Sequence, residues 1–372
     1  MKMKSPKRSR AWASGLWGIL LVMEGIAVPA VAQPSGTTAP VMDYPLSVRS
    51  VAMAASGVAD RFDPGNIYFN PANVTALQEI YATGSYELVA PRGPSDLWFG
   101  HASVGGGRTF RGDNPIHLAF DFTYARFSYG KSIYTTVTGE EIGEFEAPED
   151  YFAFTAGASK KVSERVEVAV GAAYKYWAWD LGPNSFVPDS LVPDMSALDL
   201  SANMFDFGVV VSTVLDASDW RVKPAVGVAV VNSGSDVEVD DTSESLPTWL
   251  NYGATVRVEG PMVTLASASV PSLSATLNVD GRHGLSHQDP RWSFGSEISF
   301  LQVIFVRWGR RIDDHWRLPE TTWGAAIGVP VGPVRARLEY AHVSKLYSQW
   351  TYYAADRDKF GLVIAYRFGD GG

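Results

Sequence analysis

The stretch KFGLVIAYRF, residues 359–368, indicates the fold class of this chain. Successive side chains of a β-strand point to opposite faces. One face of this stretch is apolar and partly aromatic: Phe360, Leu362, Ile364, Tyr366 and Phe368. The other face is small except for one charge: Gly361, Val363, Ala365 and Arg367. This division is typical of a strand in a membrane-spanning barrel, which has lipid on one side and the lumen on the other.

Thirteen upstream segments alternate in the same way, some less cleanly, and each is predicted to be a strand. They are 78–90, 96–104, 116–124, 150–160, 164–178, 199–215, 220–231, 249–259, 272–280, 291–299, 302–310, 321–330 and 333–343. We expect a bulge near Phe205 in the segment 199–215. Bacterial single-chain barrels of the outer membrane have an even number of strands. The sequence therefore predicts an all-β fold, a membrane-spanning antiparallel up-and-down β-barrel of about fourteen strands.

The connections between these segments alternate in length. The long ones are 129–149, 181–198, 232–248, 280–290, 311–320 and 344–358. The short ones fall near 161–163, 216–219, 260–262, 299–301 and 331–332. Outer-membrane barrels have short periplasmic turns and longer outside loops, which is the pattern seen here. The first two connections fit less well, because 91–95 is short for an outside loop and 105–114 is long for a turn.

A soluble β-sandwich would show the same alternation, since it also buries one face of each strand. Two features favour the barrel. The strands reach about ten residues, the length that crosses a bilayer at a tilt. Tryptophans also gather near strand ends, as in the aromatic girdles of membrane barrels. These are Trp177, Trp179, Trp249, Trp292, Trp308 and Trp323.

The N-terminus has the pattern of an export signal. A basic region is followed by an apolar stretch from Ala11 and by the small-residue site Ala30-Val31-Ala32. We expect a secretory signal at residues 1–32 that is cleaved after Ala32. An N-terminal membrane anchor is the alternative, and Glu24 within the apolar stretch argues against it. Together with the strand pattern, this signal predicts the bacterial outer membrane as the location.

The composition excludes several functions. Removing the signal takes away five basic residues and one acidic residue, so the formal net charge moves from −9 to −13. Such an acidic chain argues against a nucleic-acid partner. The chain contains no cysteine, which excludes disulfides, thiolate chemistry and cysteine-bound metals. No G-x-S-x-G motif is present, and His283 and His287 are expected in a solvated loop beside Asp280 and Asp289. We therefore predict no enzyme, catalytic residue, metal site or cofactor.

Residues 33–77 lack strand alternation and contain the turn signal Asp63-Pro64-Gly65-Asn66. We predict a plug at 33–77, the barrel at 78–368 and a short tail at 369–372. The lumen face of the predicted barrel carries charges of both signs, which favours ion pairs with a plug over a charge-selective pore. Our hypothesis is a polar network that holds the plug around Asp60, Asp63 and Asn70; the alternative is ordinary lumen polarity. Its predicted members are Glu297, Arg307, Arg335, Arg337, Glu339 and Arg367.

The segment VRSVAMAASGVADRFDPGNIYFNPANVTAL, residues 48–77, resembles the N-terminal signature of the FadL superfamily of outer-membrane barrels. Asn70-Pro71-Ala72 matches its NPA triplet, and the turn that begins at Asp63 matches the region before it. Ala54-Ala55 departs from the glycines common there, and Asn73-Val74 from the usual glycine-leucine pair. The resemblance implies a plug inside a fourteen-stranded barrel.

Later motifs resemble the PorV/PorQ branch of that superfamily. They are Val231-Asn232-Ser233-Gly234, Leu277 to Asp280, Gly295-Ser296-Glu297 and Val306-Arg307-Trp308-Gly309. The branch includes a component of protein secretion, which implies an accessory of export whose partners are cargo proteins or secretion components. FadL members admit hydrophobic small molecules such as long-chain fatty acids, which is the alternative function. A third possibility is a structural barrel without transport. In each case outer-membrane lipids surround the barrel.

Overall fold

The computed structural model describes residues 39–89, 97–110, 112, 114–135, 138, 140–180, 200–239, 242–265, 268–285, 290–313, 320–331, 333–345 and 356–366. The predicted signal, the predicted tail, Arg367 and His287 lie outside these residues. None of the helices in the described ranges is long and apolar enough to cross a membrane.

The chain begins with a compact segment of short helices, residues 39–77, which we call the plug. Its elements are the 3-10 helix η1 (Pro40–Asp43), the α-helix α2 (Val48–Ala52), and the 3-10 helices η2 (Pro64–Tyr68) and η3 (Pro71–Ala76). Proline at the first helical turn starts three of them, since it lacks only an N–H that is unpaired there anyway. Side-chain caps add to this: Ser47 accepts the N–H of Ser50 at 3.0 Å, and Asn70 accepts that of Ala72 at 3.0 Å.

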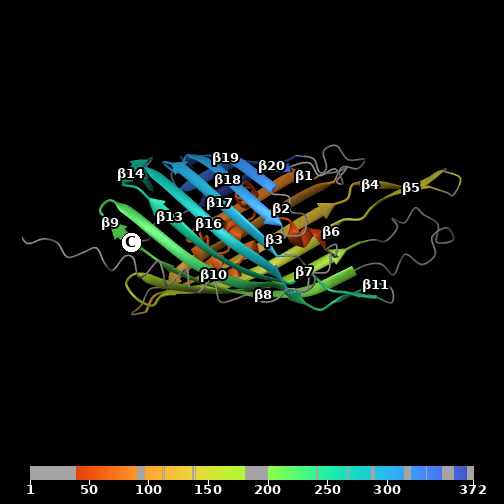
Figure 1. The fold of residues 1–372 in the computed structure, drawn as a ribbon, viewed down its shortest axis with the longest axis horizontal. Helices are drawn as coiled ribbons and strands as arrows, with labels where there is room; N and C mark the ends of the chain where they lie inside the picture. Colours follow the sequence, from red (N-terminus) through yellow and green to blue (C-terminus); the bar gives the residue numbers. More distant parts are fainter. Residues whose placement is uncertain are drawn as a thin grey trace, which may run out of the picture. The chain divides into compact units, whose positions relative to one another are not determined.

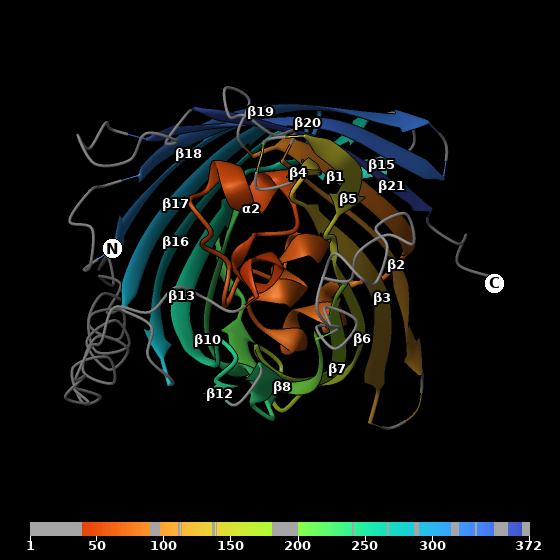
Figure 2. The same cartoon turned by 90° about the vertical axis from the view of Figure 1, so that its right-hand side faces the viewer.

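Fourteen strands form one closed antiparallel sheet around the plug (Figures 1 and 2). In chain order they are β1 (Ile80–Leu88), β2 (Trp98–Phe110), β3 (Ile116–Ser128), β6 (Glu149–Lys161), β7 (Val166–Trp179), β8 (Leu200–Thr213), β10 (Trp220–Gly234), β13 (Trp249–Glu259), β16 (Leu273–Gly284), β17 (Arg291–Phe300), β18 (Ile304–Asp313), β19 (Glu320–Val331), β20 (Val334–Lys345) and β21 (Arg357–Tyr366). Each pairs with the next, and β21 pairs with β1 to close the ring. The predicted fourteen-stranded antiparallel barrel is confirmed.

Smaller strands extend the barrel at its two ends (Figure 1). At one end, the long-loop end, stand the hairpins β4–β5 (Lys131–Thr135 and Glu141–Glu146) and β11–β12 (Val237–Val239 and Thr242–Glu244). At the other, the short-turn end, lie β9 (Leu215–Ala217) and the hairpin β14–β15 (Met262–Leu265 and Ala268–Pro271). The latter hairpin occupies the place where the sequence predicted only a short turn near 260–262.

Two other sequence expectations differ in detail. The sequence predicts a long turn at 105–114, but β2 continues to Phe110 and pairs there with Ile116. Its glycines leave room for the plug, since a Cβ on Gly107 would meet the carbonyl oxygen of Leu77. The bulge expected near Phe205 lies opposite it, on the neighbouring strand. Its extra residue is in β10, between Val230 and Ser233.

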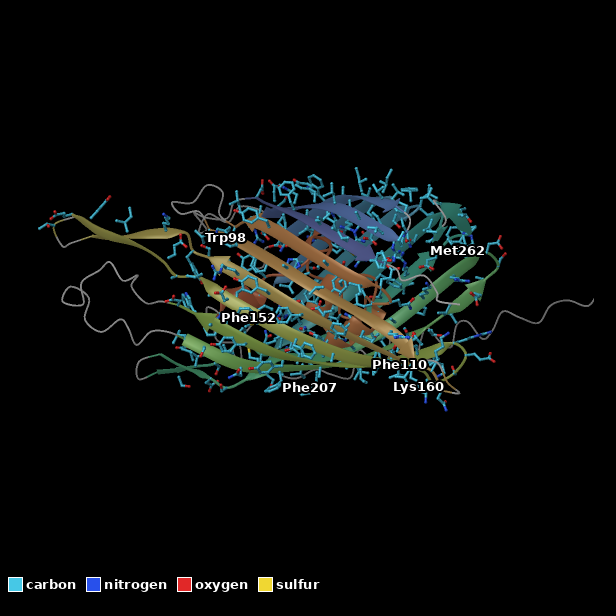
Figure 3. All side chains as sticks on the ribbon, turned by 180° about the vertical axis from the view of Figure 1, so that it is seen from behind. Trp98, Phe110, Phe152, Lys160, Phe207 and Met262 are labelled. Atoms are coloured by element: carbon cyan, nitrogen blue, oxygen red, sulfur yellow. The ribbon has the colours of Figure 1, made fainter. Side chains whose placement is uncertain are left out.

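The two faces of the barrel differ in chemistry, as the alternation predicted. Large apolar side chains project outward from nearly every strand (Figure 3). Among them are Phe120, Phe154, Phe207, Leu277, Val306, Ile327, Leu338 and Phe360. Buried polar side chains occupy the lumen face, for example Asp121, Lys175, Asp206, Glu297, Arg307 and Glu339. So continuous an apolar exterior is unfavourable in water and suits a hydrocarbon surrounding.

Candidate functional site

The plug fills the middle of the barrel, as Figure 2 shows in orange and red. The motif Asn70-Pro71-Ala72 lies directly against the barrel wall. The Asn70 amide donates to the carbonyl of Val58 in the plug at 3.0 Å and to that of Val209 in β8 at 3.1 Å. A Cβ on Gly171 of β7 would collide with the backbone of Pro71. The motif therefore fits a wall whose glycines let two backbones approach closely.

A chain of buried ion pairs joins the plug to the late strands, and Arg49 of α2 is its centre. Its Nη1 lies 2.6 Å from the Asp60 carboxylate within the plug. Its Nε lies 2.8 Å from the Glu297 carboxylate of β17. Glu297 also contacts Arg307 of β18, with 2.8 Å between Nε and Oε2. All four side chains are buried, so plug and wall share their charges away from water.

The chain of charges continues along the wall and returns to the plug. Arg307 Nη2 lies 2.9 Å from the Glu339 carboxylate of β20. Glu339 also contacts Arg337 Nε at 2.8 Å. Arg337 Nη2 reaches the Asp63 carboxylate of the plug at 3.4 Å, and Asp63 accepts the Ser47 hydroxyl at 2.7 Å. We call this set of seven residues the charge network: Arg49, Asp60, Asp63, Glu297, Arg307, Arg337 and Glu339.

Sequence reasoning proposed four of these wall residues as a network, and the structure brings them together. Arg335, proposed with them, points instead to Glu79 near the short-turn end. Arg367 lies outside the described residues. Arg49 was missed, although the only charge in the run VRSVAMAA could have been the signal.

Burial acts against the charges of the network, and oppositely charged neighbours oppose its effect. Burial works against the charged form of Arg49, but Asp60 and Glu297 hold its pKa well above the ordinary value. Burial raises the pKa of Asp63, helped by Glu339 and opposed by Arg49 and Arg337. The arrangement therefore depends on each partner, because removing one leaves an uncompensated buried charge.

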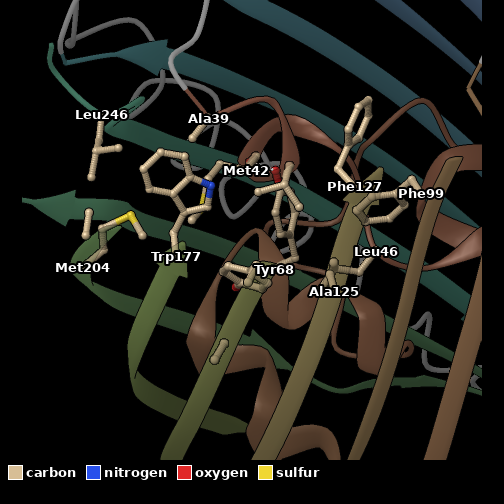
Figure 4. Close-up of a cluster of buried hydrophobic side chains, with 14 of the residues drawn as sticks. Ala39, Met42, Leu46, Tyr68, Phe99, Ala125, Phe127, Trp177, Met204 and Leu246 are labelled. Atoms are coloured by element: carbon tan, nitrogen blue, oxygen red, sulfur yellow. Dashed lines mark hydrogen bonds between the residues drawn. The ribbon is translucent and has the colours of Figure 1, made fainter. Parts of the chain in front are cut away.

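Toward the long-loop end the plug is held by apolar contact (Figure 4). We call this group the apolar cluster. From the plug it includes Val41, Met42, Leu46, Val58, Tyr68 and Phe69, and from the wall Phe99, Phe127, Tyr151, Trp177 and Met204. Tyr44 packs beside it, with its ring 5.4 Å from that of Phe99 and 5.2 Å from that of Phe127.

One carboxylate anchors the plug at the edge of the apolar cluster. Glu149, the first residue of β6, accepts the backbone N–H of Val41 at 3.2 Å and the indole N–H of Trp177 at 3.2 Å. The Tyr129 hydroxyl donates to the same carboxylate. The sequence pattern makes Glu149 the last residue of the connection 129–149, because an acid at the boundary of a strand gives no sign that it points inward.

Two further polar groups belong to the wall: Asp280 holds the plug, and Lys175 joins neighbouring strands. Asp280 of β16 accepts the backbone N–H groups of Gly57 and of Val58, the latter at 3.0 Å. At the bulge of β10, Lys175 Nζ lies 2.5 Å from the Asp206 carboxylate and 2.7 Å from the Asn232 amide oxygen. Asp280 is thus a plug contact rather than a loop residue. Within the described residues, no cluster of His, Asp and Glu side chains could hold a metal ion.

A cavity of about 380 Å³ lies at the short-turn end, between the plug and the late strands. Plug residues Arg61 and Phe62 border it on one side, and Phe305 and Arg335 border it on the other. Polar and apolar side chains both line it, so it can accommodate a molecule that carries both kinds of surface.

No protein-family model matches this chain, and no curated protein sequence matches it. Solved barrels with a similar chain path include the FadL homologue of Pseudomonas aeruginosa, with a TM-score of 0.44 and 10% identity over 91% of this chain and 100% of that chain. The Pseudomonas putida toluene transporter TodX gives a TM-score of 0.46 and 10% identity, over 86% and 96%. The β domain of the Bordetella autotransporter BrkA gives a TM-score of 0.42 and 9% identity, over 78% of this chain and 100% of that chain.

Proposed function

We propose that this protein is an outer-membrane barrel that acts as an accessory of protein export, in the manner implied by its PorV/PorQ-like motifs. The long-loop end would face outward and present secreted proteins, and the short-turn end would face the periplasm. The observation that carries the proposal is the combination of a filled lumen with hairpins that extend beyond the barrel. The charge network fixes the plug, whereas β4–β5 stands clear of the wall in Figure 1.

The hairpins offer surface that a partner could cover. Ile133 in β4 is half exposed, and Lys131, Glu141 and Glu146 are exposed around it. An apolar side chain surrounded by charges is a common arrangement at protein contact sites. A plugged barrel with such a surface works through contact at its rim and needs no open pore.

The test is mass spectrometry of the protein extracted gently from its native outer membrane. We expect exported proteins or secretion components to copurify with the natural chain. They should be lost when residues 132–145 are replaced by an Asn-Gly turn, and they should stay when 263–270 are replaced in the same way. Equal copurification with both variants would contradict a role for the β4–β5 hairpin.

The apolar cluster favours a second candidate, the passage of hydrophobic small molecules. Its wall is aromatic, with Phe99, Phe127 and Trp177 around Met42 of the plug, so an apolar ligand could take the place of the plug segment. A hydrophobic molecule at near one-to-one ratio in the same extract, without any protein partner, would favour passage over the export role.

A further inference from the structure

The cavity at the short-turn end has the size and surface of a ligand site that neither candidate function uses. Its volume of about 380 Å³ lies within the usual range for small-molecule pockets, roughly 300–1,000 Å³. The turn residues Leu301 and Gln302 border it, and so do Ala268 and Val270 of the β14–β15 hairpin. It is therefore reached from the short-turn end, on the side of the plug away from the apolar cluster.

The charge that faces the cavity is positive. Five cationic side chains line it: Arg61, Lys223, Arg257, Arg335 and Arg337. Four carboxylates also belong to its lining, but all four are buried: Asp63, Glu79, Glu259 and Glu297. In the pair Lys223–Glu259, the lysine side chain is 27% exposed and the glutamate 9%. In the pair Arg335–Glu79 the values are 44% and 8%.

This asymmetry has a simple cause. The carboxylates emerge from the wall or plug beneath Lys223 and Arg335, so these two cationic ends remain exposed. Arg257 is buried to the same degree as its partner Glu259. Lys223 Nζ lies 2.7 Å from Glu259, and its other ammonium hydrogens stay available to a second acceptor. An anion entering the cavity would meet the exposed donors of Lys223 and Arg335 first, whereas a cation would meet like charges first.

An aromatic platform lies beside these cations. Phe62, at a turn of the plug, is 36% exposed. Its ring centre is 4.4 Å from the Arg257 guanidinium and 5.7 Å from Lys223 Nζ. Leu77 and Phe305 add further apolar surface. A flat apolar body would therefore stack on Phe62 with an acidic group directed to Lys223.

We propose that this cavity binds a compact organic anion, an aromatic or alicyclic carboxylate. Its carboxylate accepts from Lys223 and its ring lies against Phe62, while Arg335 supplies positive charge from the neighbouring part of the lining. The β14–β15 hairpin borders the site through Val270, which is buried. The proposal does not depend on the function assigned to the long-loop end.

The test is calorimetric titration of the whole chain in nanodiscs of zwitterionic lipid with 2-naphthoate. The matched ligand is the neutral 2-naphthamide, which keeps the ring and lacks the negative charge. We expect saturable one-to-one binding of naphthoate, at least about tenfold tighter than that of the amide, because a charge-assisted hydrogen bond is lost with the amide.

Variants locate the site. Lys223→Met is expected to weaken naphthoate binding by about tenfold. Lys160→Met, which removes an exposed lysine of β6 outside the cavity lining, should leave binding unchanged. Phe62→Ala should weaken the binding of both naphthoate and naphthamide, because both rings lie against Phe62. If Lys223→Met fails to fold, Arg335→Met takes its place, because that side chain is the most exposed of the cavity cations. Equal affinity for naphthoate and naphthamide, or naphthoate affinity unchanged in the Lys223 or Arg335 variant, would overturn the proposal.

Discussion

The barrel holds its plug by opposite means in two regions. Beside β17, β18 and β20 it uses buried charge, with Arg49 between Asp60 and Glu297. Toward the long-loop end it uses apolar contact, with Met42 and Leu46 among aromatic side chains of the wall. Charged partners fix one position, and the loss of either partner leaves a buried charge unpaired. Apolar contacts have no direction, so one can be exchanged for another. The charge network therefore locates the plug, and the apolar cluster is the part of the interface that tolerates an exchange of contacts.

The largest expected effect breaks the charged region. Arg49→Met leaves the Asp60 and Glu297 carboxylates buried without this partner, and the free energy of unfolding should fall by about 3–5 kcal/mol. The measurement is the midpoint of urea unfolding in detergent micelles. The matched control is Arg221→Met, whose ion pair with Asp216 is exposed and should contribute below about 1 kcal/mol. Equal losses in the two variants would mean that the network does not hold the plug.

A smaller effect is expected in the apolar cluster. Met42→Ala removes a buried side chain that can be partly replaced by its neighbours, so it should cost about 2–3 kcal/mol. The control Met262→Ala changes an exposed methionine and should stay within about 0.5 kcal/mol. A second measurement uses the natural chain. Limited proteolysis followed by mass spectrometry should show cleavage of the plug near residue 42 before cleavage near residue 49. Simultaneous cleavage at both would contradict the division of the plug into two regions.

A third change tests the fit of the plug to the wall outside the two regions. Gly171→Ala places a methyl group against the backbone of Pro71, which cannot rotate away, and should cost about 1–3 kcal/mol. Gly112→Ala is the control, because nothing lies within 4 Å of its added Cβ. Urea unfolding of the two variants gives the comparison. A neutral Gly171→Ala would show that the plug moves freely along the wall.

The smallest expected effect is the coupling between the regions. Arg49 and Met42 share no partner in the charge network or the apolar cluster, so their losses should add to within about 0.5 kcal/mol. In contrast, Arg49→Met combined with Glu297→Gln should be far from additive, because both act on one ion pair. A double-mutant cycle of unfolding free energies measures both terms. Strong coupling between Arg49 and Met42 would merge the two regions into one.

Period-two alternation was enough to predict all fourteen barrel strands, because lipid outside and polar lumen inside act on every residue of each strand. It also placed Glu297 and Arg307 on the lumen face. It could not find Arg49 as their partner, since the plug has no period and 248 residues separate Arg49 from Glu297. It also missed the inward direction of Glu149 and the β14–β15 hairpin, which depend on local turn geometry and not on a repeated pattern.

The seam of the barrel has a consequence for how the protein is made. The first barrel strand pairs with the last, from Ile80 opposite Tyr366 to Glu87 opposite Lys359. Lys359 also donates to the carbonyl oxygen of Pro45 in the plug, across 314 residues of sequence. Contacts between such distant parts of a chain slow folding. Closing the ring and enclosing the plug are therefore one late event, and a chain that ends before β21 loses both together.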